Sequence, residues 1–246
     1  MARYYVTPDD VRGDTALITG EDVRHIRNVL RAAPGDPITL CDGLGTVYDS
    51  RIERIGDTIL CRIISGGPDT HEPDVRLTVV QAIPKGDKMD AVIQKCVELG
   101  ASRIIPVYSE FTVVRPDPKG DANKLTRWQR IAREAAKQCC RGVIPTVDSP
   151  AHLTDAAAPE EGETGIMAWE RCTGDPKGII RSAGSRVRIL IGSEGGFSAA
   201  EAAWAESVGY KLISMGPRIL RSETAGPALC AAVMYESGNW NNTEER

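Results

Sequence analysis

Two short segments in the last third of the chain contain the residues best suited to chemistry. The segments IGSEGGF (191–197) and MGPRILRSETAGPA (215–228) each follow a short aliphatic run and precede an alanine-rich stretch that favours a helix. Each is therefore predicted to be a loop at the carboxyl end of a buried strand, which is where an open α/β sheet binds its ligand. Glycines there let the backbone approach a bound molecule, and Arg218, Arg221 and Glu223 place charge beside it.

The glycine-rich segment 191–197 matches no standard nucleotide-binding motif. It has neither the GxGxxG order of a dinucleotide fold nor the order of a P-loop. A tight turn with positive φ at Gly195 or Gly196 is the structural alternative to a binding loop. Because Glu194 would repel a phosphate, the segment suits a ligand that carries an amine or a sulfonium cation.

Hydroxyl side chains next to both segments have an expected role in capping helices. Ser198 and Glu201 have the spacing of a capping box. Ser222 or Thr224 is expected to cap the helix that follows the second segment.

The two arginines of the second segment are harder to explain as structural residues. Arg218 and Arg221 flank the apolar pair Ile219 and Leu220 in a predicted loop, so their charges need a partner. Glu223 is one candidate partner and an RNA phosphate is the other.

Basic residues are concentrated in the middle of the chain. The whole chain has a net charge of −4, but residues 85–141 hold twelve Lys and Arg against seven acidic residues, a net charge of +5. Five of these cations recur every three to four residues, and so would line one side of a helix: Arg127, Arg130, Arg133, Lys137 and Arg141. Such a patch suits a polyanion bound at one defined surface. A solvated helix face is the alternative interpretation.

Several classes of protein are excluded by what the sequence lacks. The three histidines are far apart, and neither an HExxH motif nor a GxSxG motif is present, which argues against metal-dependent or nucleophilic hydrolysis. Seven cysteines without a CxxC pair indicate reduced thiols of a cytoplasmic protein and no metal site. No apolar run is long enough to cross a bilayer, and the N-terminus does not resemble a signal peptide.

The elements that position these residues fall into two parts. Residues 3–66 contain short strands and one expected helix at 21–31, and residues 65–74 have the composition of a linker. From residue 75 strands alternate with helices, which predicts a mostly parallel sheet covered on both faces. We therefore expect an α/β fold with a small N-terminal β-barrel (1–72) and a larger C-terminal α/β domain (73–246).

Six segments together resemble the bacterial 16S ribosomal RNA uridine-N3 methyltransferases, which belong to the knotted SPOUT superfamily. In the order of that family, and across about residues 3–237, they are HIRNVLR with GDPITLCDG, KGDKMDAVIQKCVELGASRIIPV, REAAKQCCR, LIGSEGGFSAAE and MGPRILRSETA. The resemblance implies a PUA-like barrel that docks RNA and a C-terminal domain tied in a trefoil knot. It also implies a homodimer that uses S-adenosylmethionine and no metal.

The resemblance carries a methyl-donor site onto residues 167–170, 190–196 and 215–220. The residues expected to bind the donor are Met167, Ala168, Trp169, Leu190, Gly192, Glu194, Gly195, Gly196, Met215, Gly216, Ile219, Leu220 and Thr224. Backbone groups of the glycines and Met215 would hold adenine and ribose, while Ile219 and Leu220 would pack on the base. The residues expected to contact RNA are Arg24, Arg27, Arg31, Lys85, Lys88, Arg115, Arg130, Arg133 and Arg141.

Three positions depart from the usual pattern of the family. Ser193 stands where Pro is common, Ser222 where Thr is common, and Phe111 where Arg is common. The first two change loop stiffness and one methyl group. The third removes a charge that would touch RNA, for which Arg115 is a candidate substitute.

The resemblance thus implies transfer of a methyl group from S-adenosylmethionine to N3 of a uridine in 16S ribosomal RNA. Because N3 carries a proton and takes part in base pairing, the target must be unpaired or displaced from its stack. Arg221 is expected to stabilise the uracil anion, with Arg218 and Glu223 orienting it; either Glu223 or water takes the proton.

Two other functions compete with this interpretation. One is an RNA-binding assembly factor of the ribosome whose methyl-donor site is vestigial. The other is a nucleotide-dependent enzyme that acts on a small molecule, which would leave the basic middle of the chain unexplained.

Overall fold

A computed structural model describes residues 3–173 and 175–240 of the chain. Internal contacts divide the chain into two compact units. The first unit is the chain as far as Glu72 together with the segment Ala136–Ile144, and the second is Pro73–Ala135 together with the chain from Pro145 onward. Residues 136–144, expected from the sequence in the C-terminal domain, make their contacts within the first unit.

The first unit is built on a six-stranded sheet in the order β1-β4-β5-β6-β3-β2. Its strands are β1 (Arg3–Tyr5), β2 (Val11–Arg12), β3 (Thr15–Ile18), β4 (Pro37–Cys41), β5 (Thr46–Ile55) and β6 (Ile59–Pro68). The pairing of β1 with β4 is parallel and the other pairings are antiparallel. Aliphatic residues of alternate strand positions, among them Ile18, Leu40 and Ile59, fill the core of this unit. A short 3₁₀ helix (Pro8–Asp10) precedes β2.

The helix expected over residues 21–31 is shorter and changes its winding. It consists of α1 (Glu21–Arg24) and a π-helical turn (His25–Val29), and Arg31 lies in the left-handed region with φ 52°. Because the wider turn shifts the later residues around the axis, only Val23 and Ile26 reach the core. Val29, at the end of the π-helical turn, is 67% exposed.

The linker expected at 65–74 begins later than the sequence indicates. Residues Ser65–Pro68 continue β6 and pair with β5 as far as Thr46. Gly66 leaves room for the Tyr48 ring, since a Cβ there would lie 2.9 Å from the ring. Strand pairing therefore orders a glycine-rich run whose composition alone predicts a loop.

The segment Ala136–Ile144 is fixed to the first unit by buried polar contacts. The guanidinium of Arg141 lies 2.7 Å from the Glu72 carboxylate, and the Tyr5 hydroxyl donates to the Arg141 carbonyl over 2.7 Å. Gly142 N–H donates to Asp69, which also pairs with Arg3 at 2.9 Å. Arg141 is only 4% exposed, so its predicted place on an RNA-binding surface is wrong: its charge is neutralised inside the fold.

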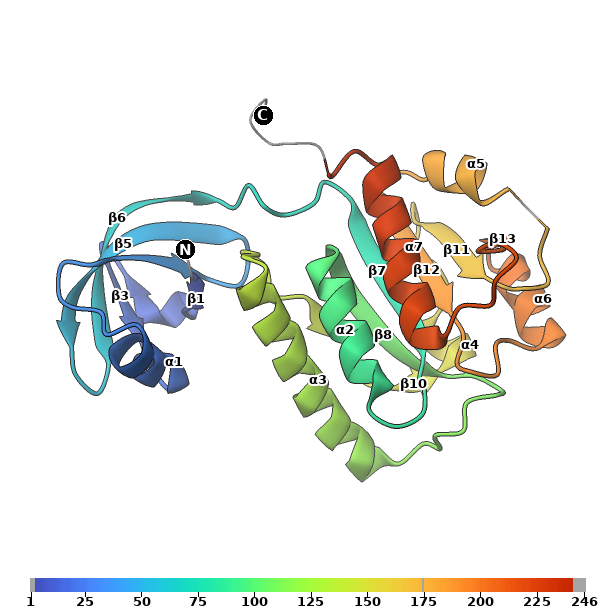
Figure 1. Ribbon diagram of the computed structural model, residues 1–246, viewed down its shortest axis with the longest axis horizontal. Helices are drawn as coiled ribbons and strands as arrows, with labels where there is room; N and C mark the ends of the chain where they lie inside the picture. Colours follow the sequence, from blue (N-terminus) through green and yellow to red (C-terminus); the bar gives the residue numbers. More distant parts are fainter. Residues whose placement is uncertain (1–2, 174, 241–246) are drawn as a thin grey trace. The chain divides into compact units, whose positions relative to one another are not determined.

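The second unit contains a seven-stranded sheet whose pairings are all parallel (Figure 1). The order is β10-β8-β7-β12-β11-β13, with β9 also paired to β8. The strands are β7 (Arg76–Ala82), β8 (Ala101–Tyr108), β9 (Thr146–Val147), β10 (Ala151–His152), β11 (Thr164–Ala168), β12 (Arg186–Ile191) and β13 (Tyr210–Ile213). The expected fold class, a parallel α/β domain joined to a small β domain, is confirmed. The trefoil knot stays a prediction.

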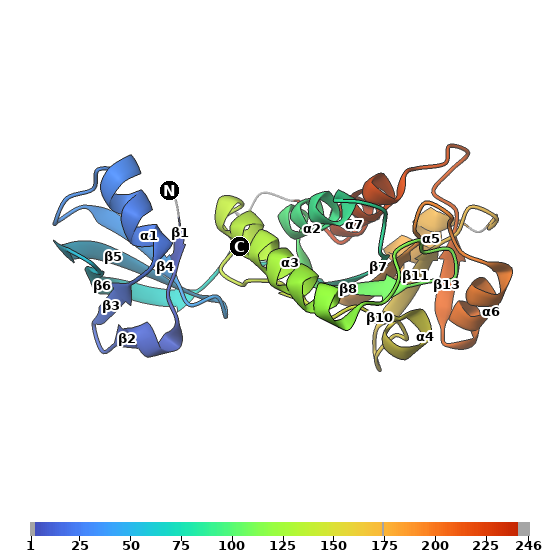
Figure 2. The same cartoon turned by 90° about the horizontal axis from the view of Figure 1, so that it is seen from below.

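Helices cover both faces of this sheet (Figure 2). On one face are α2 (Lys88–Glu98), α5 (Pro176–Arg181) and α7 (Ser222–Glu236), and on the other are α4 (Leu153–Ala156) and α6 (Ala199–Ser207). The long α3 (Pro118–Gln138) lies beside α2, to which Arg127 is joined by ion pairs with Asp87 and Asp90. In α2 the buried residues recur at helical spacing, from Met89 to Val97. No helix in the described part of the chain has the length and hydropathy to cross a membrane.

Candidate functional site

The sheet order brings the carboxyl ends of β12, β11 and β13 next to one another. The loop after β12 (residues 192–197, the glycine loop) and the loop after β13 (residues 214–221, the arginine loop) enclose a cavity of about 800 Å³, here called the glycine-loop pocket. Predicted site residues that line it are Ala168, Trp169, Gly192, Glu194, Gly195, Gly196, Met215, Gly216, Ile219 and Leu220, together with Arg218, Arg221 and Lys88. The two segments singled out from the sequence therefore form one site.

Four residues predicted for donor binding or catalysis do not line the glycine-loop pocket. Met167 and Leu190 are fully buried in the sheet, because their side chains point into the core between β11 and α6. Thr224 is exposed on the first turn of α7. Glu223 lies beside the pocket and contacts residues that line it, among them Lys88 at 3.5 Å.

The glycine loop has no room for larger residues. Gly196 has φ 66°, as expected of one of the two glycines, and a Cβ on Gly192 would lie 3.0 Å from the Gly196 Cα. A Cβ on Gly195 would lie 2.6 Å from the Cβ of Phe111. The loop is thus a tight cradle whose backbone faces the pocket, which no other residue type could form at these positions.

Lys88 organises the carboxylates of this site. Its Nζ lies 2.8 Å from Glu194, which also accepts from the Lys85 backbone N–H at 3.2 Å. Burial alone would raise the pKa of Glu194, but the hydrogen bonds from Lys88 and the backbone outweigh it and lower that pKa. Lys88, expected from the sequence to contact RNA, instead forms an ion-pair bridge between Glu194 and Glu223.

The arginine loop is far more open than the glycine loop. The Arg221 side chain is 79% exposed and its Nη1 lies 4.0 Å from the Glu223 carboxylate. Arg218 is also exposed, and no ion pair joins it to any residue that the structure describes. Both guanidinium groups are therefore available to an anion that enters the pocket.

Capping at the two helices differs from the prediction at one of them. The capping box of Ser198 and Glu201 is confirmed, with the Glu201 N–H donating to the Ser198 hydroxyl over 3.2 Å. At α7 the N-cap residue is Arg221, and Ser222 is already the first helical residue. The expected cap by Ser222 or Thr224 is wrong, because the chain turns into the helix one residue earlier. The first N–H groups of α7 therefore have no side-chain cap.

Two buried polar atoms in the pocket wall have no hydrogen-bond partner among the described residues: Ser193 Oγ and Trp169 Nε1. Orphaned buried donors and acceptors are rare in folded proteins and indicate a missing partner. Ser193 was noted in the sequence only as a departure from a family pattern, and no local motif marks it. Ser214, which also lines the pocket, gave no signal beyond its place after β13.

The other predicted RNA contacts are distributed over the surfaces of both units. Arg24, Arg27 and Arg31 are exposed on the first unit. On the second unit the exposed ones are Lys85, Arg115, Arg130 and Arg133. Arg127 and Lys137, expected on the same helix face, are held by acidic side chains.

Within the described residues no cluster of His, Cys, Asp or Glu could hold a metal ion. All seven cysteines are free thiols, and Cys41, Cys61, Cys96 and Cys230 are buried. Burial raises the pKa of Cys41 to about 11, which keeps this thiol protonated and unreactive.

Comparisons with known proteins agree with this architecture. A family model described as an RNA methyltransferase domain matches residues 71–234, and one described as an RNA methyltransferase PUA domain matches residues 18–64. Ribosomal RNA small subunit methyltransferase E of Bacillus subtilis is 32% identical, over 96% of this chain and 97% of its own. The protein of that name from Synechocystis is 30% identical, over 94% of this chain and 76% of its own.

A solved structure extends the likeness to the fold. The crystal structure of ribosomal RNA small subunit methyltransferase E from Neisseria gonorrhoeae, bound to S-adenosyl methionine, is 32% identical with a TM-score of 0.86. The match covers 96% of this chain and 97% of that one. The chain thus belongs to the RNA methyltransferase family that includes ribosomal RNA small subunit methyltransferase E.

Proposed function

We propose that this protein transfers the methyl group of S-adenosylmethionine to N3 of a uridine in 16S ribosomal RNA. The observation that carries the proposal is the glycine-loop pocket, in which a backbone cradle, two orphaned polar atoms and two exposed arginines face one cavity. A relative with the same fold and 32% identity has been crystallised with this methyl donor, which supports the choice of ligand.

The residues of the pocket fit a nucleoside that carries a sulfonium group. Ser193 Oγ and Trp169 Nε1 lack partners, and the polar atoms of adenine and ribose can supply them. The tight turn at Gly192, Gly195 and Gly196 lets backbone groups reach the nucleoside, as no side chain could. Ile219, 86% exposed without a ligand, gains an apolar contact by covering the base. When bound, the donor supplies an electrophilic methyl carbon.

The arginine loop supplies positive charge, which the target base requires when it loses a proton. Uracil N3 becomes nucleophilic only when its proton leaves, so the base passes through an anionic state. Arg221 stands at the uncapped N-terminus of α7, where the guanidinium charge and the helix dipole both favour an anion. Arg218, on the same loop, positions the RNA backbone or the base.

Glu223 is poorly suited to accept the proton from uracil N3. Its own backbone N–H, the charge of Lys88 and the Ser222 hydroxyl lower the pKa of Glu223 despite partial burial. A carboxylate with a depressed pKa is a weak base. We infer that the proton goes to water while Arg221 stabilises the uracil anion, and that Glu223 positions Arg221 and Lys88.

The RNA reaches the site from surfaces of both units in this proposal. The first unit matches a PUA domain, and its exposed Arg24, Arg27 and Arg31 suit sequence-independent contact with phosphates. On the second unit Lys85, Arg130 and Arg133 serve the same purpose. The protein acts as a homodimer in the cytoplasm, where small ribosomal subunits are made.

Mass mapping of modified nucleosides tests the proposed reaction. In 16S ribosomal RNA from cells that lack the protein, we expect one N3-methyluridine to be lost and to return when purified protein and donor are added. Calorimetry with S-adenosylmethionine separates an enzyme from an assembly factor with a vestigial site, because the latter releases no heat. An unchanged set of modified nucleosides would refute the proposal.

A further inference from the structure

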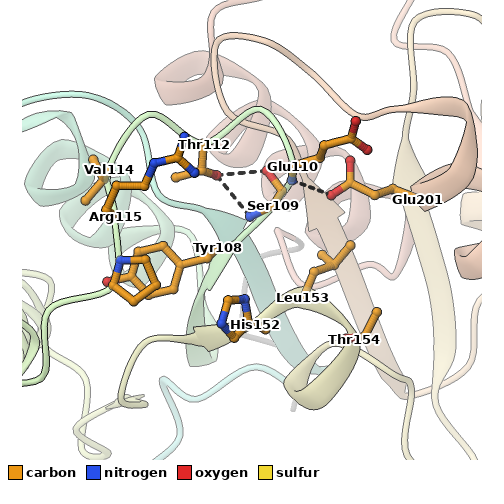
Figure 3. Close-up of a pocket in the computed structure, with 11 residues that line it drawn as sticks. Tyr108, Ser109, Glu110, Thr112, Val114, Arg115, His152, Leu153, Thr154 and Glu201 are labelled. Atoms are coloured by element: carbon orange, nitrogen blue, oxygen red, sulfur yellow. Dashed lines mark hydrogen bonds between the residues drawn. The ribbon is translucent and has the colours of Figure 1, made fainter.

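A second cavity of about 330 Å³ lies at the carboxyl end of β8 (Figure 3). Its walls are the loop 109–116, the connection from β10 to α4, and Glu201 on α6; we call it the β8 pocket. In the sheet β8 lies beyond β7, so this cavity and the glycine-loop pocket occupy the same edge of the sheet on opposite sides of β7. The function proposed above makes no use of it.

The floor of the β8 pocket is aromatic. The Tyr108 ring is buried, and its hydroxyl donates to Asp121 over 2.6 Å, so the ring is held in place. The His152 ring lies 6.1 Å from it at an interplanar angle of 53° and is exposed. Rings presented in this way are the surfaces on which unstacked RNA bases pack.

The polar groups of the β8 pocket divide into those already bonded and those still available. Ser109 and Thr112 bond to each other at 2.8 Å, and the Glu201 oxygens accept from the Glu110 and Ser198 N–H groups. That leaves the Arg115 guanidinium and the Glu110 carboxylate, neither of which has an ion pair with any described residue. Both side chains are exposed.

Together these groups complement one nucleotide. A guanidinium binds a phosphate, a ring stacks on a base, and a carboxylate accepts from a ribose hydroxyl or a base N–H. A free anion would contact Arg115 but would make no favourable contact with the aromatic rings or with the Glu110 carboxylate. The volume suits one nucleotide and excludes a helical stem.

The wall of the β8 pocket is also the support of the methyl-donor cradle. Phe111 packs against Gly195, and Glu201 both holds the Glu110 N–H and caps α6 immediately after the glycine loop. The two cavities are therefore joined through shared wall residues.

We propose that the β8 pocket binds one unpaired nucleotide of the RNA that neighbours the target uridine, with its phosphate on Arg115 and its base on His152. This inference rests on the proposed function for the identity of the RNA. The proposal gives His152 a role in substrate binding, and it assigns Arg115 to the phosphate of this one nucleotide.

The experiment uses the full-length protein and small ribosomal subunits from cells that lack it. Arg115→Gln is expected to weaken subunit binding about three- to tenfold and to lower the salt dependence by about one phosphate contact. His152→Ala is expected to weaken binding about fivefold or more, and His152→Phe to restore it, because stacking needs a ring and no proton. In the variants that bind more weakly, KM for the subunit should rise, while kcat should change less.

Lys119→Gln is the matched control, because Lys119 is exposed nearby on α3 and does not line the pocket. Its binding should stay within about twofold of wild type. Wild-type affinity for Arg115→Gln and His152→Ala, or a His152→Phe protein as weak as His152→Ala, would overturn the inference. Since binding is measured apart from methylation, subunits that bind normally but gain no N3-methyluridine would refute only the proposed function.

Discussion

The two loops that enclose the glycine-loop pocket differ in how far they are formed before any ligand binds. The glycine loop is closed on itself: Gly192 touches Gly196, Gly195 touches Phe111, and Glu194 is held by Lys88. The arginine loop, by contrast, exposes 86% of Ile219 and 79% of the Arg221 side chain. The glycine loop is therefore a preorganised wall of the pocket, whereas the side chains of the arginine loop make few contacts until donor and RNA bind.

Because of this difference, substitutions in the two loops should affect ligand binding and the stability of the protein in different proportions. Substitutions in the glycine loop must disturb packing, and so should change both donor affinity and the free energy of unfolding. Substitutions in the arginine loop remove groups that contact little in the free protein, so they should change only kinetics or affinity. Four variants test that division.

Arg221→Ala should have the largest effect. Removing the group that stabilises the uracil anion is expected to lower the single-turnover rate about 100-fold at saturating donor. The free energy of unfolding should stay within about 0.5 kcal/mol of wild type, because the side chain is exposed. Lys211→Ala, which removes an exposed cation from β13, is the control; a rate near wild type for Arg221→Ala would remove this arginine from the chemistry.

Gly195→Ala should affect both properties. The added Cβ meets Phe111 at 2.6 Å, so the loop must shift, with a cost of about 1–3 kcal/mol in unfolding free energy. We expect donor affinity by calorimetry to fall about tenfold or more. Gly184→Ala, where no atom lies within 4 Å of the new Cβ, provides the comparison. Equal behaviour of the two variants would show that the glycine loop is adaptable.

Ile219→Ser should weaken donor binding about three- to tenfold, because the apolar cover of the base is lost. Chemical denaturation should show no change beyond about 0.5 kcal/mol. Ile64→Ser, an equally polar change at a residue 63% exposed on the first unit, should leave donor binding unaltered. A destabilised Ile219→Ser protein would mean that the arginine loop is packed in solution.

Lys88→Met should have the smallest effect at neutral pH, about two- to fivefold on donor affinity. Its signature is in the pH dependence of stability. The pKa of Glu194 is lowered in the folded protein, so its contribution is present above the ordinary glutamate pKa and is lost as the pH falls through the lowered one. Lys88→Met should flatten that acid limb in denaturation curves. Superimposable wild-type and variant curves below about pH 5 would contradict the ion-pair bridge.

Local patterns in the sequence predicted the secondary structure and helix capping that depend on interactions between neighbouring residues. The alternation of strands and helices from residue 75 and the Ser198–Glu201 capping box both hold in the structure, because neighbours in sequence decide them. The strand ends also placed the segments 191–197 and 215–228 at one edge of the sheet, since parallel strands share a carboxyl edge, and both segments line one cavity. The ten donor-site residues around that cavity were implied by the family resemblance.

What the sequence did not predict depends on partners remote in the chain. Arg141 continues the spacing of a surface stripe, yet Glu72, 69 positions earlier, draws it into the fold. The β8 pocket joins Tyr108, Arg115, His152 and Glu201 from four separate elements, and no motif links them. Even the register of the helix at 21–31 changes through a π-turn that its apolar spacing does not encode.

The first unit is assembled from two stretches of chain, and this constrains how the protein could have been inherited. A single break after Glu72 would release a fragment in which Asp69 keeps Arg3 but loses the Gly142 N–H, and in which Glu72 loses the Arg141 guanidinium. Such a fragment would lack the part of its fold that residues 136–144 supply. Exchange of the complete unit would need three junctions, one after Glu72 and one on each side of residues 136–144, which favours inheritance of both units as one gene.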